Sequence, residues 1–262
     1  MRDFSEILDE VRERIAAACA RSGRNPDDVE IIAVTKTHGP ETVAEAWSAG
    51  LRTVGENKVQ EAAWKKPLCP SGPEWHLIGH LQGNKVRHAL GLFDFIHSVD
   101  SVKLLDRIEA IAEDTGARPR VLLEVNVSGE KSKSGMKPDE AAPLLRHAAE
   151  SCPRISVEGL MTMAPFSEKA EDSRPYFRSL GALRSSLEKS LHIELPRLSM
   201  GMSGDFEVAV EEGATWVRLG TVLFGERPRV KPVQACLGDG CETSGGGLDS
   251  YSGAGPTFKV LD

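Results

Sequence analysis

Short apolar runs alternate with longer amphipathic stretches along most of the chain. The first stretch is a predicted helix, because Phe4, Leu8, Val11 and Ile15 recur every three or four residues and Gly23 follows them. Eight later runs rich in Val, Ile, Leu and Phe are predicted strands, at 30–35, 52–55, 75–79, 94–98, 120–127, 156–162, 197–200 and 215–219. Helical patterns separate them, at 40–49, 57–66, 84–90, 101–114, 138–150, 169–190 and 203–212.

Eight strands that alternate with helices favour a single parallel (β/α)8 TIM barrel over residues 1–227, with the first helix as an addition to the fold. The strands are nearly continuous apolar runs, which is typical of strands covered by helices. A doubly wound open sheet shows the same alternation and is the alternative. No G-x-G-x-x-G or Walker-type loop follows a strand, which counts against a nucleotide-binding version of that sheet.

The composition changes at Pro228. Residues 228–262 contain 7 Gly, 3 Pro and 3 Ser, include the run SGGG and show no sustained periodicity. Such a segment buries too little apolar surface to offset the entropy of ordering, so a flexible, disordered tail is predicted. Cys236 and Cys241 lie in this tail with no His nearby, which is typical of an incidental pair rather than a metal or redox site.

The composition is that of an ordinary soluble protein, with 40% hydrophobic and 27% charged residues in a chain of 262. A net charge of −7 counts against a nucleic-acid-binding surface but is compatible with a local cationic pocket. No run approaches the roughly 20 apolar residues of a membrane span, and the charged N-terminus lacks the apolar core of a signal peptide. Together with five scattered cysteines, these features favour a cytoplasmic location.

Lys36 ends the apolar run VEIIAVTK, at the carboxyl end of the first predicted strand. Strand ends of this kind line the functional face of a (β/α)8 barrel. Partial burial of a lysine amine favours its neutral form, which can make a Schiff base with an aldehyde. A solvated lysine at a strand end is the alternative, and this residue alone does not decide between the two.

Two polar residues near helix starts have two interpretations each. Ser203, in LSMGMSGD, either caps the following helix or offers its hydroxyl and N–H to a phosphate. A G-x-S-x-G nucleophile turn does not fit, because Asp205 stands where the last glycine is required. Asn57, in GENKVQE, either caps its helix or faces the pocket, and capping is the simpler interpretation from the residues alone.

Arg218 interrupts the last predicted strand, in VRLGTVLFG, where a buried guanidinium needs a partner. A ligand and a buried acid such as Glu124 meet that need equally well. Gly220 allows close backbone approach, and Gly220 and Thr221 offer N–H groups at a turn. Barrels commonly bind phosphate at the loops after strands seven and eight, which is where Ser203, Gly220 and Thr221 fall.

Other candidates carry less weight. His76 and His80 are four residues apart, but a strand and then a loop hold them, so no helix face unites them and no metal site is predicted. The cationic loop 128–135, SGEKSKSG, is compatible with a mobile lid and with a solvated connection.

Several segments, in order, resemble those of the pyridoxal 5'-phosphate (PLP) homeostasis protein family. They are AVTKT, GENKVQE, WHLIGHLQGNK, VNVSGEKSKSG, GLMTM and LSMGMSGDFEVAVEEGATWVRLGTVLFG. The resemblance runs over about residues 5–227 and does not cover 228–262. That family is similar in fold to the barrel domain of bacterial alanine racemase.

The resemblance implies Lys36 as the lysine that holds PLP as a Schiff base. It implies phosphate binding by Ser203, Gly220 and Thr221, and it places Arg218 opposite the pyridine nitrogen. Asn57 falls in the family's second motif, near the cofactor. Family members often have an aromatic residue where this chain has Lys58, so the contribution of that aromatic is open here.

The first functional hypothesis is a non-catalytic PLP-binding protein, with no catalytic residue, that carries or buffers the cofactor in vitamin B6 homeostasis. Its effects on amino- and keto-acid metabolism would be indirect, and PLP-dependent apo-enzymes are candidate recipients. Arg218 stays protonated, so the ring nitrogen opposite it stays unprotonated and the ring is a weak electron sink.

Two other hypotheses stay open. A single-domain PLP-dependent amino-acid racemase is the main alternative. Racemases of this barrel type take a second base from another domain. The glycine-rich tail here is too unpatterned to form such a domain. A cofactor-free barrel that uses Lys36 as a Schiff-base lyase is the third. With no second domain in sight, a monomer is expected.

Overall fold

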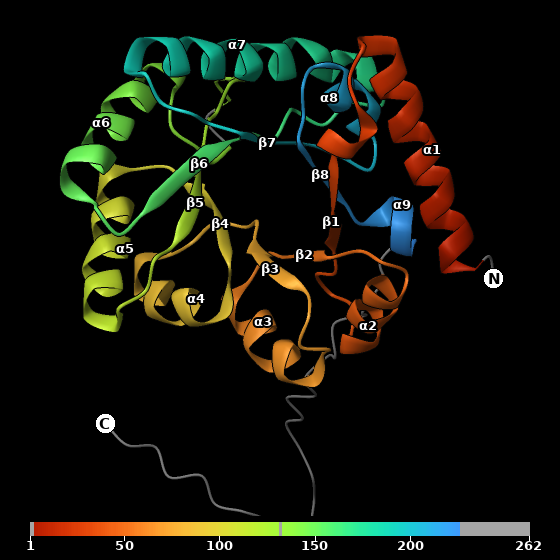
Figure 1. The fold of residues 1–262 in the computed structure, drawn as a ribbon, viewed down its shortest axis with the longest axis horizontal. Helices are drawn as coiled ribbons and strands as arrows, with labels where there is room; N and C mark the ends of the chain where they lie inside the picture. Colours follow the sequence, from red (N-terminus) through yellow and green to blue (C-terminus); the bar gives the residue numbers. More distant parts are fainter. Residues whose placement is uncertain (1–2, 131–132, 226–262) are drawn as a thin grey trace, which may run out of the picture. The chain divides into compact units, whose positions relative to one another are not determined.

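Eight parallel strands close into a barrel, each paired with the next in chain order and the last paired with the first (Figure 1). The computed structural model describes residues 3–130 and 133–225. The strands are β1 (Glu30–Val34), β2 (Thr53–Glu56), β3 (Glu74–Leu77), β4 (Phe95–Val99), β5 (Arg120–Glu124), β6 (Ser156–Met161), β7 (Arg197–Met202) and β8 (Trp216–Leu219). The predicted (β/α)8 barrel is confirmed, and the doubly wound alternative is wrong because an open sheet leaves its edge strands unpaired.

Helices alternate with the strands and cover the outside of the barrel (Figure 1). They are α1 (Phe4–Ser22), α2 (Pro40–Ser48), α3 (Val59–Lys65), α4 (Val86–Leu92), α5 (Val102–Thr115), α6 (Ala141–Ser151), α7 (Arg174–Leu191), α8 (Phe206–Glu211) and α9 (Thr221–Phe224). Turns of 3₁₀ helix occur at η1 (Pro26–Asp28), η2 (Lys66–Leu68), η3 (Gly83–Lys85), η4 (Pro138–Glu140) and η5 (Ala170–Ser173).

Several helices begin later than their hydrophobic pattern predicts. Helix α3 starts at Val59 because Lys58 is extended, with φ −129° and ψ 130°. The first turns expected for α6 and α7 are the 3₁₀ turns η4 and η5. The short α9 has no counterpart in the prediction, because one helical turn is too short to show a hydrophobic repeat.

The predicted additional N-terminal helix is α1, which packs beside α8 and α9 on the outside of the barrel (Figure 1). Asp3 caps its start by accepting a hydrogen bond from the Ser5 N–H, and Gly23 ends it in the left-handed region at φ 69°. Phe4 stacks on Phe224 with ring centroids 5.4 Å apart, so the first helix holds the segment that follows β8.

The barrel interior contains an apolar cluster and a set of buried polar side chains. The apolar cluster is Ile32, Phe95, Leu122, Met161 and Trp216. The polar set includes His76, His97, Ser199 and Arg218, each at most 4% exposed. The larger apolar core lies between the strands and the helices. The inside of the barrel therefore has room for polar side chains toward the end that carries the functional groups.

Some predictions concern residues that the structure does not describe. The tail 228–262, its Cys236 and Cys241, and the domain boundary after residue 227 lie outside the described residues and stay predictions. Within residues 3–130 and 133–225, none of the helices is both long enough and apolar enough to span a bilayer.

Candidate functional site

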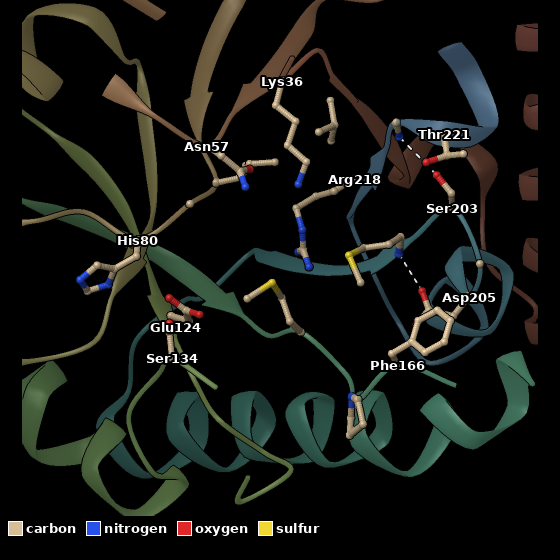
Figure 2. A pocket seen from close by; sticks show the side chains of 18 of the residues that line it. Lys36, Asn57, His80, Glu124, Ser134, Phe166, Ser203, Asp205, Arg218 and Thr221 are labelled. Carbon is tan, nitrogen blue, oxygen red and sulfur yellow. Dashed lines mark hydrogen bonds between the residues drawn. The ribbon is translucent and has the colours of Figure 1, made fainter. Parts of the chain in front are cut away.

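A cavity of about 530 Å³ lies at the carboxyl ends of the strands. All six residues that the sequence analysis selects line it: Lys36, Asn57, Ser203, Arg218, Gly220 and Thr221 (Figure 2). They come from the segments after β1, β2, β7 and β8 and from β8 itself. The fold therefore brings together residues that are up to 185 positions apart in the chain, at the end of the barrel where (β/α)8 proteins carry their functional groups.

Lys36 extends into this cavity from the turn after β1, toward Arg218 (Figure 2). The turn is unusual, because the next residue, Thr37, has φ 68°. A non-glycine residue in the left-handed region costs about 1–2 kcal/mol. The backbone immediately after Lys36, at Thr37, is therefore held in a strained conformation by its surroundings.

Arg218 is 4% exposed and its guanidinium donates to two neutral oxygens. Nη1 lies 2.8 Å from Ser199 Oγ, and Nη2 lies 2.9 Å from the Thr162 carbonyl oxygen. Burial lowers the pKa of Arg218 to about 10, so it keeps its charge at neutral pH. The ion pair with Glu124 that the sequence left open is not formed within the described residues, where Glu124 acts on Arg218 only at longer range.

The Ser203 hydroxyl faces the backbone of the segment after β8. Its Oγ accepts from the Gly220 N–H at 3.3 Å and from the Val222 N–H at 3.2 Å. Ser203 is not the cap of α8, because Asp205 occupies the N-cap position of that helix. Ser203, Gly220 and Thr221 thus form one polar corner of the cavity, with backbone donors directed to a single point.

Asn57 also departs from the capping interpretation. The N-cap of α3 is Lys58, and Asn57 lies in the cavity wall instead (Figure 2). Its backbone is fixed by close contact with Gly79, where an added Cβ would lie 2.4 Å from the Asn57 carbonyl oxygen. Lys58 is exposed and does not line the cavity.

Among the described residues, Glu124 is an acid of the cavity whose pKa is strongly raised. It lies across the cavity from Lys36, beside His80 and Ser134 (Figure 2). Burial, reinforced by the negative charge of Asp100, raises the pKa of Glu124 to about 7. From the sequence, Glu124 was expected only as a possible counter-ion of Arg218, because its burial depends on the closed barrel.

A chain of buried hydrogen bonds continues from Arg218 into the barrel. A guanidinium only donates, so Ser199 Oγ accepts from Arg218 and directs its own proton to His97 Nδ1, 3.0 Å away. His97 then donates from Nε2 to His76 Nδ1 at 2.9 Å. Burial above all, then the charges of His76 and Arg218, lowers the pKa of His97, which suits this neutral form.

The two histidines considered in the sequence, His76 and His80, lie in different places. His76 is completely buried inside the barrel, whereas His80 lines the cavity. Neither His97 nor Ser199 was selected from the sequence. The available signal was the presence of polar residues inside the apolar runs FIHSV and RLSM, whose partners are far away in the chain.

The rim of the cavity is apolar on the side of the loop after β6. Phe166 is 93% exposed there and Met163 of the same loop is partly exposed, as is Met202 at the end of β7. The loop 128–135 contributes Ser134 to the cavity, and its Lys133 Nζ donates to the Ala164 carbonyl oxygen at 2.6 Å. The described part of that loop is thus tied to the apolar rim; residues 131–132 are not described.

Comparisons with known proteins agree on a family. The family model described as the alanine racemase N-terminal domain matches residues 7–228. The pyridoxal phosphate homeostasis protein of Aquifex aeolicus is 47% identical over 223 residues, which are 85% of this chain and 97% of the relative. The human protein of the same name is 40% identical over 233 residues, 83% of this chain and 84% of its own length.

Solved structures extend the likeness to three dimensions. PipY of Synechococcus elongatus, solved with PLP bound, has a TM-score of 0.72 at 38% identity, covering 82% of this chain and all of its own. An alanine racemase of Clostridium difficile has a TM-score of 0.67 at 14% identity, covering 86% of this chain and 57% of its own, and is similar in fold alone. The chain therefore belongs to the pyridoxal phosphate homeostasis protein family, within the alanine racemase N-terminal domain fold.

Proposed function

We propose that this protein binds PLP in the Lys36 cavity and serves vitamin B6 homeostasis by holding and releasing the cofactor. The observation that carries this proposal is the meeting, in one cavity of about 530 Å³, of an amine, a buried cation and a corner of backbone donors. The volume is in the range of small-molecule sites. The family membership, and the PLP bound to its member PipY, support the same cofactor.

The residues of the cavity fit the chemical groups of PLP. The donors of Gly220 and Val222 now share the neutral Ser203 oxygen at 3.2–3.3 Å, and an anionic phosphate oxygen is a stronger acceptor. Asp205 borders this corner, but its carboxylate already accepts from the Met202 N–H at 2.7 Å and from Ser173 Oγ at 2.9 Å. It therefore adds less repulsion than an unbonded carboxylate.

Each residue has a proposed part in holding the cofactor. Lys36 supplies the amine that binds the aldehyde covalently, and Ser203, Gly220 and Thr221 hold the phosphate. Arg218 would donate from its guanidinium to the ring nitrogen, and Asn57, which also lines the cavity, would help to hold the ring. When bound, PLP supplies an electrophilic aldehyde and an electron-withdrawing ring.

The proposal is for a carrier without catalytic turnover. With its pKa at about 10, Arg218 keeps its own protons at neutral pH and withholds them from the ring nitrogen. A carrier needs only a reversible link and a firm anchor for the phosphate. PLP-dependent apo-enzymes are the proposed recipients of the released cofactor.

Glu124 supports a second candidate, a slow amino-acid racemase. Its carboxyl lies across the cavity from Lys36 with a pKa of about 7, which is suited to proton transfer near neutral pH. Incorporation of solvent deuterium at the α-carbon of amino acids separates the two candidates. Turnover of at least about 1 s⁻¹, at the low end of ordinary enzymes, would favour the racemase.

Titration of the purified protein with PLP, followed by absorbance, tests the proposed function. The native protein is expected to gain a yellow absorbance band that the Lys36→Ala variant lacks. Lys58→Ala is the matched control, because Lys58 is exposed and makes no side-chain cap bond. Equal behaviour of native protein and Lys36→Ala would remove Lys36 from the site.

Incubation with a PLP-requiring apo-enzyme tests release. The loaded protein should restore activity to the apo-enzyme in proportion to the cofactor it carries. A loaded protein that keeps its cofactor for hours in the presence of excess apo-enzyme would contradict the carrier function.

A further inference from the structure

Three charged side chains lie buried together behind the turn that carries Lys36. Glu56 ends β2, and Glu61 and Lys65 belong to α3. The side chains of Glu56 and Lys65 have no solvent exposure, and that of Glu61 has 16%. Lys65 Nζ lies 2.6 Å from Glu56 Oε1 and 3.1 Å from Glu61 Oε1. The cavity residues do not include any of the three.

This Glu56–Glu61–Lys65 cluster contacts both chain neighbours of Lys36. On one side, Lys65 Nζ donates to the Thr35 carbonyl oxygen at 2.9 Å, and Thr35 Oγ1 donates to Glu56 Oε1 at 2.6 Å. On the other side, the Thr37 N–H donates to Glu61 Oε1 at 2.5 Å. The backbone is thus fixed immediately before and immediately after the lysine.

The second of these contacts falls on the strained residue. Thr37 has φ 68°, and a strained backbone persists only where its surroundings over-determine it. Its N–H is bonded to Glu61, which is itself held by Lys65. The cluster therefore supplies a restraint at the point where the turn would otherwise relax.

Stability alone does not account for the cluster. A buried ion pair costs much of its attraction in desolvation, and apolar replacements of similar volume are often neutral or stabilising. Glu56 Oε2 has no hydrogen-bond partner within the described residues. Burial raises the pKa of Glu56 in spite of its bonds to Lys65 and Thr35. The clear consequence of the arrangement is geometric, because among the described residues each side-chain hydrogen bond from the cluster to another residue goes to Thr35 or Thr37.

We propose that the Glu56–Glu61–Lys65 cluster is a positioning device that sets the direction of the Lys36 side chain for covalent capture of an aldehyde. This inference rests on the proposed function and adds positioning residues to it. The cluster acts through the backbone of Thr35 and Thr37 and does not touch the ligand. It predicts a specific split: the rate of covalent capture depends on the cluster, and the affinity for the rest of the ligand does not.

Glu61 offers the sharpest test, because it is partly exposed and its loss leaves the Glu56–Lys65 pair in place. Glu61→Gln keeps an oxygen that accepts from the Thr37 N–H, and Glu61→Ala removes it. We expect Glu61→Ala to slow capture of PLP roughly 10- to 100-fold, since a misplacement of about 1 Å has that effect. Glu61→Gln should stay within about threefold of the native rate, because it retains the hydrogen bond.

Binding of pyridoxine 5'-phosphate, which has the ring and phosphate but no aldehyde, is measured beside the capture rate. Its Kd should be unchanged in Glu61→Ala to within a factor of about two. Equal capture rates for Glu61→Ala and Glu61→Gln would overturn the inference. A capture rate and a pyridoxine phosphate affinity that fall together would also overturn it, since the cluster would then shape the whole cavity.

A double variant removes both members of the buried Glu56–Lys65 pair together, and the partly exposed Glu61 carboxylate keeps its bond from the Thr37 N–H. Glu56→Gln with Lys65→Met should fold, should slow capture to a similar extent and should leave pyridoxine phosphate binding intact. Lys66→Met is the matched control, because the neighbouring Lys66 Nζ bonds the Leu92 carbonyl oxygen, away from Lys36. A double variant that captures PLP at the native rate would contradict the inference.

Reductive methylation of Lys36 by formaldehyde and cyanoborohydride, followed by peptide mass mapping, gives a readout without PLP. If the native protein does not capture PLP, the proposed function fails. In that case, a methylation rate at Lys36 that still differs between Glu61→Ala and Glu61→Gln supports positioning by the cluster. An unchanged rate removes the inference as well.

Discussion

The Arg218 guanidinium donates to the Ser199 hydroxyl across 2.8 Å, and this single contact sets the direction of every hydrogen bond behind it. Because the Arg218 guanidinium cannot accept a hydrogen bond, the Ser199 hydroxyl donates its proton to His97 Nδ1. His97 in turn donates from Nε2 to His76 Nδ1. The cation at the cavity is thus fixed by a chain of hydrogen bonds that reaches into the barrel.

Ser199→Ala removes the hydroxyl that holds Nη1 of Arg218. A hydrogen bond to a charged group contributes about 1.5–3 kcal/mol, so we expect the Kd for PLP to rise roughly 10- to 100-fold. Equilibrium titration by absorbance measures it. Ser185→Ala, on the exposed face of α7, should leave the Kd unchanged. An unaltered Kd in Ser199→Ala would show that the chain does not hold Arg218.

Arg218→Gln removes the charge and leaves an amide at the cavity. Retention of PLP should weaken, and the absorbance band of the bound cofactor should shift because the group opposite the ring nitrogen has changed. Gel filtration followed by spectroscopy checks both effects. If retention and spectrum both match those of the native protein, Arg218 does not contact the cofactor.

The raised pKa of Glu124 predicts that the protein loses stability as the pH rises from acid to neutral. Its pKa is about 7 in the folded protein against an ordinary value of 4.5, so between these values the folded state binds more protons than the unfolded chain. The free energy of unfolding therefore decreases as the pH rises from about 4.5 to 7, by on the order of 3 kcal/mol when Glu124 is fully ionised.

Glu124→Gln should remove that dependence. Relative to the native protein, the variant should gain stability at pH 8 and show little difference at pH 4.5, as measured by urea unfolding. Glu13→Gln, at an exposed position of α1, is the control that should change neither value. A stability difference that is the same at both pH values would contradict the assigned pKa.

Gly79→Ala should disturb the position of Asn57. The added Cβ would lie 2.4 Å from the Asn57 carbonyl oxygen, and such overpacking costs about 1–3 kcal/mol. Gly83→Ala is the matched control, because its Cβ would meet nothing within 4 Å. Thermal unfolding of the two variants compares them directly, and equal melting temperatures would show that the contact between Gly79 and Asn57 is not tight.

The fold could be predicted from the sequence because short apolar runs alternate regularly with longer helical repeats along the chain. Every predicted strand range overlaps a strand of the barrel, and α1 was recognised from its apolar repeat. The start of α3 and the single turn of α9 were not, because φ and ψ at a helix end depend on contacts more than on pattern.

The candidate site was predictable only where a residue stood out in its own segment. Lys36 and Arg218 stood out because each ends or interrupts an apolar strand. The hydrogen bond between His97 and Ser199 joins residues 102 positions apart. In the sequence, Lys65 is indistinguishable from an exposed helix lysine, and only the structure shows that it is buried. Which residues support the site depends on such distant pairings. That the six cavity residues hold PLP stays a prediction.

Borohydride reduction of the PLP-loaded protein, followed by peptide mass mapping, tests the central claim most directly. We expect one stable adduct with the mass of reduced PLP on the peptide that contains Lys36, and its loss in Lys36→Ala. An adduct on another lysine alone, or no adduct after incubation with excess PLP, would contradict the account.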